Sequence, residues 1–142
     1  MRLSIAEIVK KTVDSKGKDE KIDVLRKNNS QPLRMILRYT YDPKIKFNLP
    51  DVRPPWNRNG LVDIHGMLYT EARQLRLFIV GGPYDGRISR LKTEMKFIEM
   101  LESVDDKDAE ILANMIEKKP IKGITKAVLE EAFPGIFEEK FY

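Results

Sequence analysis

Apolar residues recur at helical intervals along most of the chain, with polar or helix-breaking residues between the runs. Ser4 precedes Glu7 by three residues, which is the spacing of a capping box, and the apolar residues that follow predict a helix over about 4–13. Ser30, with Pro32 in the first helical turn, can begin another. With the helix at Ser30 included, four further helices are predicted, over about 19–27, 30–42, 70–80 and 88–103.

The segment 105–137 has the pattern of a helix, a short basic loop, a second helix and a stop signal. An aspartate pair at its start supplies an N-cap for the first helix, and Pro120 and Gly123 end that helix. The second helix begins at Ile124 or Thr125 and ends before a Phe-Pro-Gly sequence. The segment therefore predicts two neighbouring helices joined by a loop that carries positive charge.

Together these patterns predict one mainly α domain, a compact fold of five to seven helices over residues 1–142. Two parts lie outside the helices, an irregular Pro-rich loop at about 43–60 and a short aromatic tail at 137–142. The tail either packs back on the core or acts as a terminal docking peptide.

Four of the eight prolines lie between residues 43 and 55, which predicts the irregular loop. A loop of this length in a compact domain often has a function. Alternation over 45–49 predicts a short extended piece. Trp56 lies between Arg53 and Arg58, so it either touches nucleic acid or pins the loop to the core.

Composition narrows the class of protein. The 142 residues include 42% hydrophobic residues, which is typical of a globular domain, and no cysteine, which excludes disulfides and thiolate metal sites. No apolar run is long enough to span a membrane, and the N-terminal residues lack the apolar core of a signal peptide. We therefore expect a cytoplasmic protein without a membrane partner.

The charge is divided unevenly. Residues 1–60 contain 14 Lys and Arg against 7 Asp and Glu, whereas residues 61–142 contain 12 against 15. The basic half of the chain can bind a polyanion, whereas the acidic half argues against a polyanion-binding surface that covers the whole molecule. The alternative is that these charges merely solvate helix faces.

The sequence offers little for catalysis. His65 is the only histidine, and with Asp63 it forms the only local metal-like pair, so we expect no metal, no cofactor and no enzymatic activity. Nucleotidyl-transferring ligases use a Lys-x-Asp-Gly motif in which the lysine takes AMP. Pro83 stands at that lysine's place in this chain, and a proline provides no nucleophile.

The basic loop is a better candidate for binding chemistry. A helix start presents unpaired backbone N–H groups and the positive end of the helix dipole, and both favour an anion. A glycine permits close approach, and the surrounding cations are Lys118, Lys119, Lys122 and Lys126. The loop therefore predicts either a phosphate-backbone site or a solvated turn between two helices.

Several short motifs occur in one order along the chain, namely Ile5–Val9, Gly17–Lys21, Val24–Asn28, Leu33–Arg34, Arg38–Tyr41, Gly66–Leu68, Gly123 and Pro134–Ile136. Together they resemble the N-terminal, all-helical DNA-binding domain of the ATP-dependent DNA ligase of T-even phages. The resemblance covers roughly the whole chain except the Pro-rich loop. It implies a helical domain that grips the backbone and minor-groove side of duplex DNA.

The resemblance also implies site residues. A loop-to-helix start that lies against phosphate corresponds to residues 123–125, with a lysine on either side, and the turn ahead of the second helix corresponds to residues 17–21. The chain departs from the family at Pro120 and Ile121, where an acidic residue and a leucine are usual. No adenylation lysine motif follows, so the resemblance implies a stand-alone phage protein without ligase chemistry.

Our first hypothesis is a non-enzymatic protein that binds duplex or nicked DNA. The residues expected to contact DNA are Lys18, Lys21, Lys118, Lys119, Lys122, Gly123, Thr125 and Lys126. The alternative is a protein-interaction module that docks a replication or transcription protein, such as a sliding clamp. That partner would be bound by the tail residues Phe137, Phe141 and Tyr142.

Overall fold

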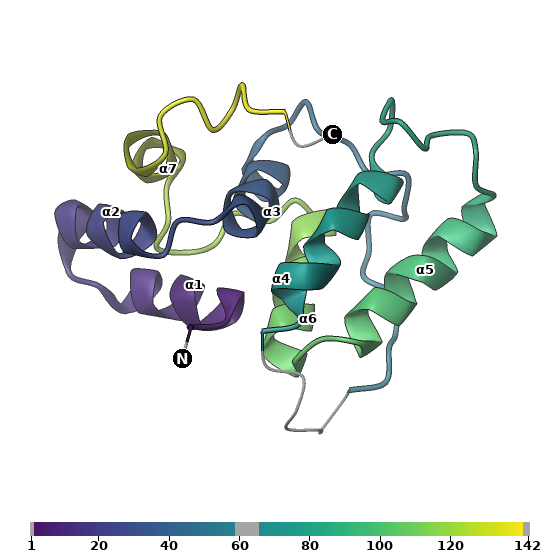
Figure 1. Cartoon of the computed structure of the whole chain (residues 1–142), viewed down its shortest axis with the longest axis horizontal. Helices are drawn as coiled ribbons and strands as arrows, with labels where there is room; N and C mark the ends of the chain where they lie inside the picture. Colours follow the sequence, from purple (N-terminus) through teal and green to yellow (C-terminus); the bar gives the residue numbers. More distant parts are fainter. Residues whose placement is uncertain (1, 59–65, 141–142) are drawn as a thin grey trace.

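Seven α-helices and one 3₁₀ helix form most of residues 2–58 and 66–140, which are the residues that this computed structural model describes (Figure 1). No β-strand occurs among them. The helices are α1 (Ile5–Asp14), α2 (Gly17–Lys27), α3 (Gln31–Tyr41), α4 (Leu68–Glu71), the 3₁₀ helix η2 (Ala72–Phe78), α5 (Arg90–Glu102), α6 (Asp106–Ile116) and α7 (Lys126–Ala132). The expectation of a single, mainly helical domain is confirmed.

Local signals set the start of most helices. The Ser4 hydroxyl accepts from the Glu7 N–H at 3.1 Å and the Glu7 carboxylate accepts from the Ser4 N–H at 2.8 Å, so the predicted capping box is present. Ser30 caps α3 and Thr125 caps α7 in the same way. Asp105, rather than its neighbour Asp106, caps α6. These side chains satisfy backbone N–H groups that a helix start leaves unpaired.

The helices gather into two groups with α6 between them (Figure 1). α2 packs against both α1 and α7, while α5 and η2 pack on each other at the opposite end of the molecule. α6 contacts α1, α3 and α5. The fully buried Asp108 of α6 accepts the Ala6 N–H at 2.8 Å and so ties α6 to the first turn of α1.

The core is continuous through both groups. Its largest fully buried side chains include Tyr39, Phe78 and Phe97. Phe78 and Phe97 meet edge to face, with ring centroids 5.4 Å apart. This contact joins η2 to α5, so the inner face of α5 is fixed to the body of the domain.

The prediction of one helix over 70–80 is wrong in its type and bounds. The helix begins at Leu68, and from Ala72 to Phe78 it is a 3₁₀ helix. The fully buried residues of η2 are Ala72, Leu75 and Phe78, which recur every third residue. Three residues per turn place such residues on one face, which a 3.6-residue helix would not do as well.

The Pro-rich loop includes the extended piece that its alternation predicts. Phe47 forms an isolated antiparallel bridge with Ile79, and the Asn48 N–H donates to the Phe78 carbonyl at 2.6 Å. The Val80 N–H donates to the Lys46 carbonyl at 2.8 Å. These bonds hold the first part of the loop against the segment that follows η2.

Candidate nucleic-acid interface

The contact between Lys21 and Gly123 joins the two basic segments that the resemblance singles out. Lys21 Nζ donates to the Gly123 carbonyl at 2.6 Å, although the residues are 102 positions apart. Gly123 has φ +99°, and a Cβ built there would lie 3.2 Å from Cγ1 of Val13. A glycine therefore favours both the left-handed backbone and the close approach to α1.

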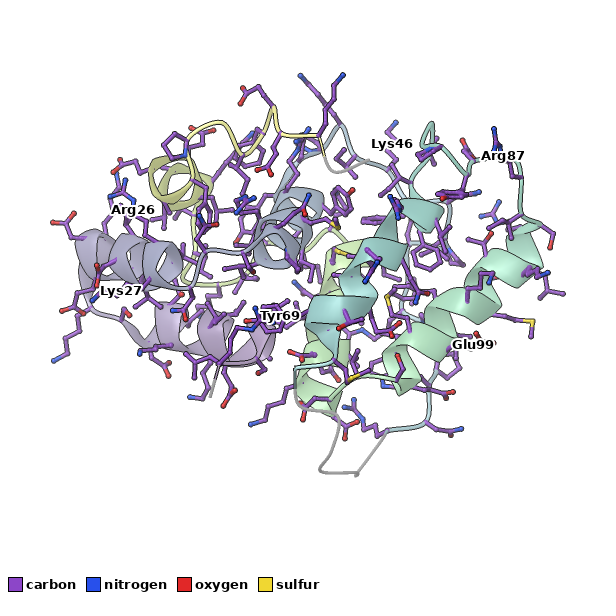
Figure 2. All side chains as sticks on the ribbon, viewed as in Figure 1. Arg26, Lys27, Lys46, Tyr69, Arg87 and Glu99 are labelled. Atoms are coloured by element: carbon purple, nitrogen blue, oxygen red, sulfur yellow. The ribbon has the colours of Figure 1, made fainter. Side chains whose placement is uncertain are left out.

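Other polar residues of α2 hold α7 in place. Lys18 Nζ lies 2.5 Å from the Glu131 carboxylate, and both side chains are about half exposed. The guanidinium of Arg26 donates to the carbonyls of Glu131 at 2.7 Å and Ala132 at 3.4 Å, at the C-terminal end of α7 (Figure 2). A cation at a helix C-terminus satisfies carbonyls that the helix leaves free. Lys18 and Lys21 thus have structural partners and also remain accessible at the surface.

Lys118 is half-buried between the end of α6 and the end of α3. Its Nζ donates to the carbonyls of Tyr39, Asp42 (2.8 Å) and Ile45 (2.9 Å), at and just beyond the C-terminal end of α3. The ammonium also lies 5.5 Å from the ring centroid of Phe47. Burial lowers the pKa of Lys118 to about 8. All three ammonium protons have acceptors, so Lys118 links the end of α6 to α3. Its charge is therefore not part of the candidate DNA-binding surface.

Three lysines of the loop do face solvent. Lys119 has a side chain 66% exposed, and its ammonium lies 3.6 Å from the Glu117 carboxylate, a long contact. Lys122 is exposed, and no ion pair involves it among the described residues. Lys126 is exposed and its Nζ lies 4.7 Å from the ring centroid of Phe137. These three side chains and the pair on α2 form what we call the basic rim, made of Lys18, Lys21, Lys119, Lys122 and Lys126.

Thr125 has a helix-capping role. Its hydroxyl accepts the Val128 N–H at 3.2 Å, which uses one of the N–H groups at the start of α7. α7 has only 7 residues, so its dipole is short. The anion-binding capacity of this segment therefore rests on its lysines.

The tail residues up to Glu139 are held by α3. Arg34 pairs with the Glu139 carboxylate through two nitrogens at 2.9 and 3.0 Å. Arg38 donates to the carbonyls of Ile136 at 3.0 Å and Glu139 at 2.5 Å. Phe137 is half-buried against the core. Phe137 thus packs back on its own chain, whereas Phe141 and Tyr142 lie outside the described residues.

The arginines beside Trp56 have acidic partners. Arg53 donates to Glu117 through its backbone N–H at 3.0 Å and through its guanidinium at 2.9 Å, and the same guanidinium lies 2.5 Å from Glu110. Arg58 pairs with Glu110 as well. The pairing with Arg53 lowers the pKa of Glu117 to about 2. Trp56 packs against the core, so this part of the loop lies on α6.

The described residues contain no candidate metal site. No three Asp or Glu side chains within residues 2–58 and 66–140 are grouped so that they could hold a metal ion. Asp63 and His65 lie outside the described residues. In the same ranges no helix is long and apolar enough to cross a membrane.

The comparisons with known proteins give one match. A protein-family model described as a family of unknown function (DUF6433) matches residues 8–122. No curated protein and no solved structure matches the chain. The matched segment includes α2 through α6 and most of the basic loop, and it ends one residue before Gly123.

Proposed function

We propose that this chain, which belongs to the family of unknown function DUF6433, is a non-enzymatic protein that binds the backbone of duplex or nicked DNA. The observation that carries the proposal is the hydrogen bond of Lys21 to the Gly123 carbonyl at 2.6 Å. This bond brings together two lysine-bearing segments, one near each end of the chain. Phosphate-backbone binding depends on several cations that act at one surface.

The basic rim supplies those cations. Lys119, Lys122 and Lys126 are exposed within eight consecutive positions of the chain. An exposed lysine that binds phosphate releases condensed counterions, and this release is the main source of affinity for a DNA backbone. Lys18 and Lys21 extend the same charge onto α2. The resemblance to a ligase DNA-binding domain supports the same assignment.

The rim contains features for binding phosphate but few for reading bases. Lysine is a point charge, and the surrounding loop contributes backbone groups rather than the bidentate side chains that recognise base edges. We therefore expect recognition of duplex shape, or of a nick, with little dependence on base sequence.

The experiment is fluorescence-anisotropy binding to intact, nicked and single-stranded DNA over a salt series. The test variant is Lys119→Ala with Lys122→Ala. Its control is Arg87→Ala with Lys107→Ala, which removes the same charge from exposed positions away from the basic loop. Figure 2 shows Arg87 towards the end of the molecule opposite Arg26.

We expect log K to fall linearly with log salt, and the test variant to reduce that slope by about 2, one unit for each lysine. The control is expected to leave the slope unchanged. If the slope falls equally in the test and control variants, net charge alone accounts for binding. No binding at low salt would overturn the proposal and favour the protein-partner alternative.

A further inference from the structure

A pocket of about 470 Å³ lies between the Pro-rich loop, the segment after η2 and the end of α6. Its lining residues are Pro43, Ile45, Lys46, Phe47, Asp51, Val80, Ile116 and Lys118. Pockets that bind small molecules usually measure roughly 300–1,000 Å³ and combine apolar walls with a few polar groups. This pocket therefore has the size and the composition of a small-molecule site.

Most of the pocket wall is apolar. Ile45 of the loop and Ile116 of α6 are buried core residues that also line the pocket. Phe47 is half-buried, and Val80 is 49% exposed although its side chain is aliphatic. An apolar group in the pocket would remove these surfaces from water, so the wall favours a ligand with an apolar body.

Hydrogen bonds hold the pocket wall in place. The Val80 N–H donates to the Lys46 carbonyl at 2.8 Å, and the isolated bridge formed by Phe47 lies next to that bond. Lys118 Nζ donates to the Ile45 carbonyl at 2.9 Å, which joins the loop to the end of α6. A preformed pocket loses little conformational entropy on binding, so most of the interaction energy of a small ligand remains as affinity.

Two unpaired charges of opposite sign line the pocket. Lys46 and Asp51 are exposed, and neither side chain has a hydrogen bond or an ion pair within residues 2–58 and 66–140. Figure 2 shows Lys46 at the upper edge of the molecule. Lys118 adds no free donor, because its three protons are bonded to backbone carbonyls. A complementary ligand therefore carries one negative group for Lys46 and one positive group for Asp51.

We propose that this pocket binds a free amino acid with an apolar side chain. Its carboxylate lies at Lys46, its ammonium at Asp51, and its side chain against Phe47 and Val80. A fatty acid would place a second negative charge near Asp51, an apolar amine would place a second positive charge near Lys46, and a peptide terminus carries only one of the two charges. Of these ligands, only the zwitterion complements both charges and the apolar wall.

The proposal is independent of DNA binding, because no residue of the basic rim lines the pocket. Loss of one activity in a variant therefore leaves the other to be measured separately.

The first test is a titration of the isotope-labelled full chain with L-phenylalanine, L-leucine and L-serine, observed by two-dimensional NMR of the backbone amides. We expect the two apolar amino acids to give saturable shifts at residues 45–51 and at Val80, with a Kd of about 0.1–1 mM. L-serine is expected to give none at the same concentrations, because it has no apolar body. Absence of saturable shifts at these residues with both apolar amino acids, up to about 10 mM, would overturn the proposal.

Ligand analogues test the two charges. Phenylpropionate lacks the ammonium and phenethylamine lacks the carboxylate, while both keep the phenyl group. Each is expected to bind the parent about fivefold more weakly than L-phenylalanine. Tighter binding of either analogue than of L-phenylalanine would exclude the zwitterion.

Variants assign each charge to its residue. In Lys46→Gln, L-phenylalanine is expected to bind no better than phenethylamine, and in Asp51→Asn no better than phenylpropionate. Lys44→Gln is the matched control, because Lys44 is exposed but does not line the pocket. It is expected to bind all three ligands as the parent does. Parent-like binding of L-phenylalanine by both pocket variants would overturn the assignment.

A substitution in the wall tests the position of the apolar side chain. Val80→Ser removes an aliphatic group from the pocket and is expected to weaken L-phenylalanine binding about fivefold. Val52→Ser is the matched control, because Val52 is also exposed but does not line the pocket. Circular dichroism checks that both variants keep the fold. Equal effects of the two substitutions would mean that the amino acid binds elsewhere.

Discussion

Lys118 Nζ lies 2.8 Å from the carbonyl oxygen of Asp42, and this bond joins the second residue beyond α6 to the C-cap of α3. The same ammonium serves two further carbonyls, and Lys118 itself has a left-handed backbone, with φ +57°. A non-glycine residue holds that conformation only where surrounding contacts fix it.

We expect Lys118→Ala to lower the free energy of unfolding by about 2 kcal/mol, because it removes the ammonium that donates to the carbonyls of Tyr39, Asp42 and Ile45, of which only that of Asp42 also accepts the Ile45 N–H among the described residues. Urea titration measures the change. Lys119→Ala is the control next to it in the chain, and its exposed side chain predicts a change within about 0.5 kcal/mol. Equal effects of the two substitutions would show that Lys118 has no special structural role.

Glu117 gives a pH-dependent prediction. Its folded pKa of about 2 is below the usual 4.5, so the pair with Arg53 stabilises the fold above pH 4.5 and the contribution is lost as the pH falls from 4.5 towards 2. Glu117→Gln removes this contribution. We expect the variant to be less stable than the parent by about 2 kcal/mol at pH 7 and the difference to shrink in acid. Thermal melts from pH 7 to pH 2 measure it.

The matched substitution for that experiment is Glu138→Gln, at an exposed position of the tail. It is expected to leave stability unchanged at every pH. A parent–variant gap at Glu117 that stays constant down to pH 2 would mean that the gap comes from packing rather than from the charge.

Gly123→Ala is expected to destabilise the fold by about 1–2 kcal/mol, because the new Cβ meets Val13 and the backbone has φ +99°. Gly86→Ala is the matched control, since Gly86 has φ +78° but no atom within 4 Å of the built Cβ. The two variants differ in the steric contact of the new Cβ, so the difference between their free energies of unfolding, measured by chemical denaturation, reports that contact. A larger effect at Gly86 would be inconsistent with the close approach of the loop to α1.

The two arginines of α3 are expected to differ in their effect. Arg34→Ala removes the partly buried, bidentate pair with Glu139 and is expected to lower stability by about 1 kcal/mol. Arg38→Ala leaves the carboxylate of the buried Asp42 without its guanidinium, 2.8 Å away, and is expected to change stability by about 3 kcal/mol. Limited proteolysis is expected to release the tail sooner in both variants. Unchanged cleavage in both would mean that the tail is held by other contacts.

Local chemistry predicted most helices correctly. Ser4, Ser30 and Asp105 are caps because each side chain bonds to a backbone N–H two or three residues away, and such bonds are visible in a short stretch of sequence. The three-residue spacing of Ala72, Leu75 and Phe78 in η2 is also visible in the sequence. A period of 3.6 residues fits most of the same apolar positions, so the sequence predicted an α-helix there.

Long-range partners could not be predicted from the sequence. The three acceptors of Lys118 lie 73 to 79 positions away, so in the sequence it was indistinguishable from the exposed Lys119 and Lys122. The same limit applies to Arg53, whose position beside Trp56 suggested nucleic acid but whose partners are Glu110 of α6 and Glu117, the C-cap of α6. The contact between Lys21 and Gly123 was not predicted either, because no local pattern connects residues 102 positions apart, although the resemblance named both segments.

The packing of α7 on α2 has a consequence for synthesis on the ribosome. α2 is complete at Lys27, but its neighbour α7 is finished only at Ala132. Until then the nascent chain has the α1–α2 hairpin without the helix that covers it, and Ile22 and Leu25 lack part of their packing. The N-terminal helices therefore cannot reach their final stability as they emerge, and the last stage of folding waits for the release of the C-terminal segment.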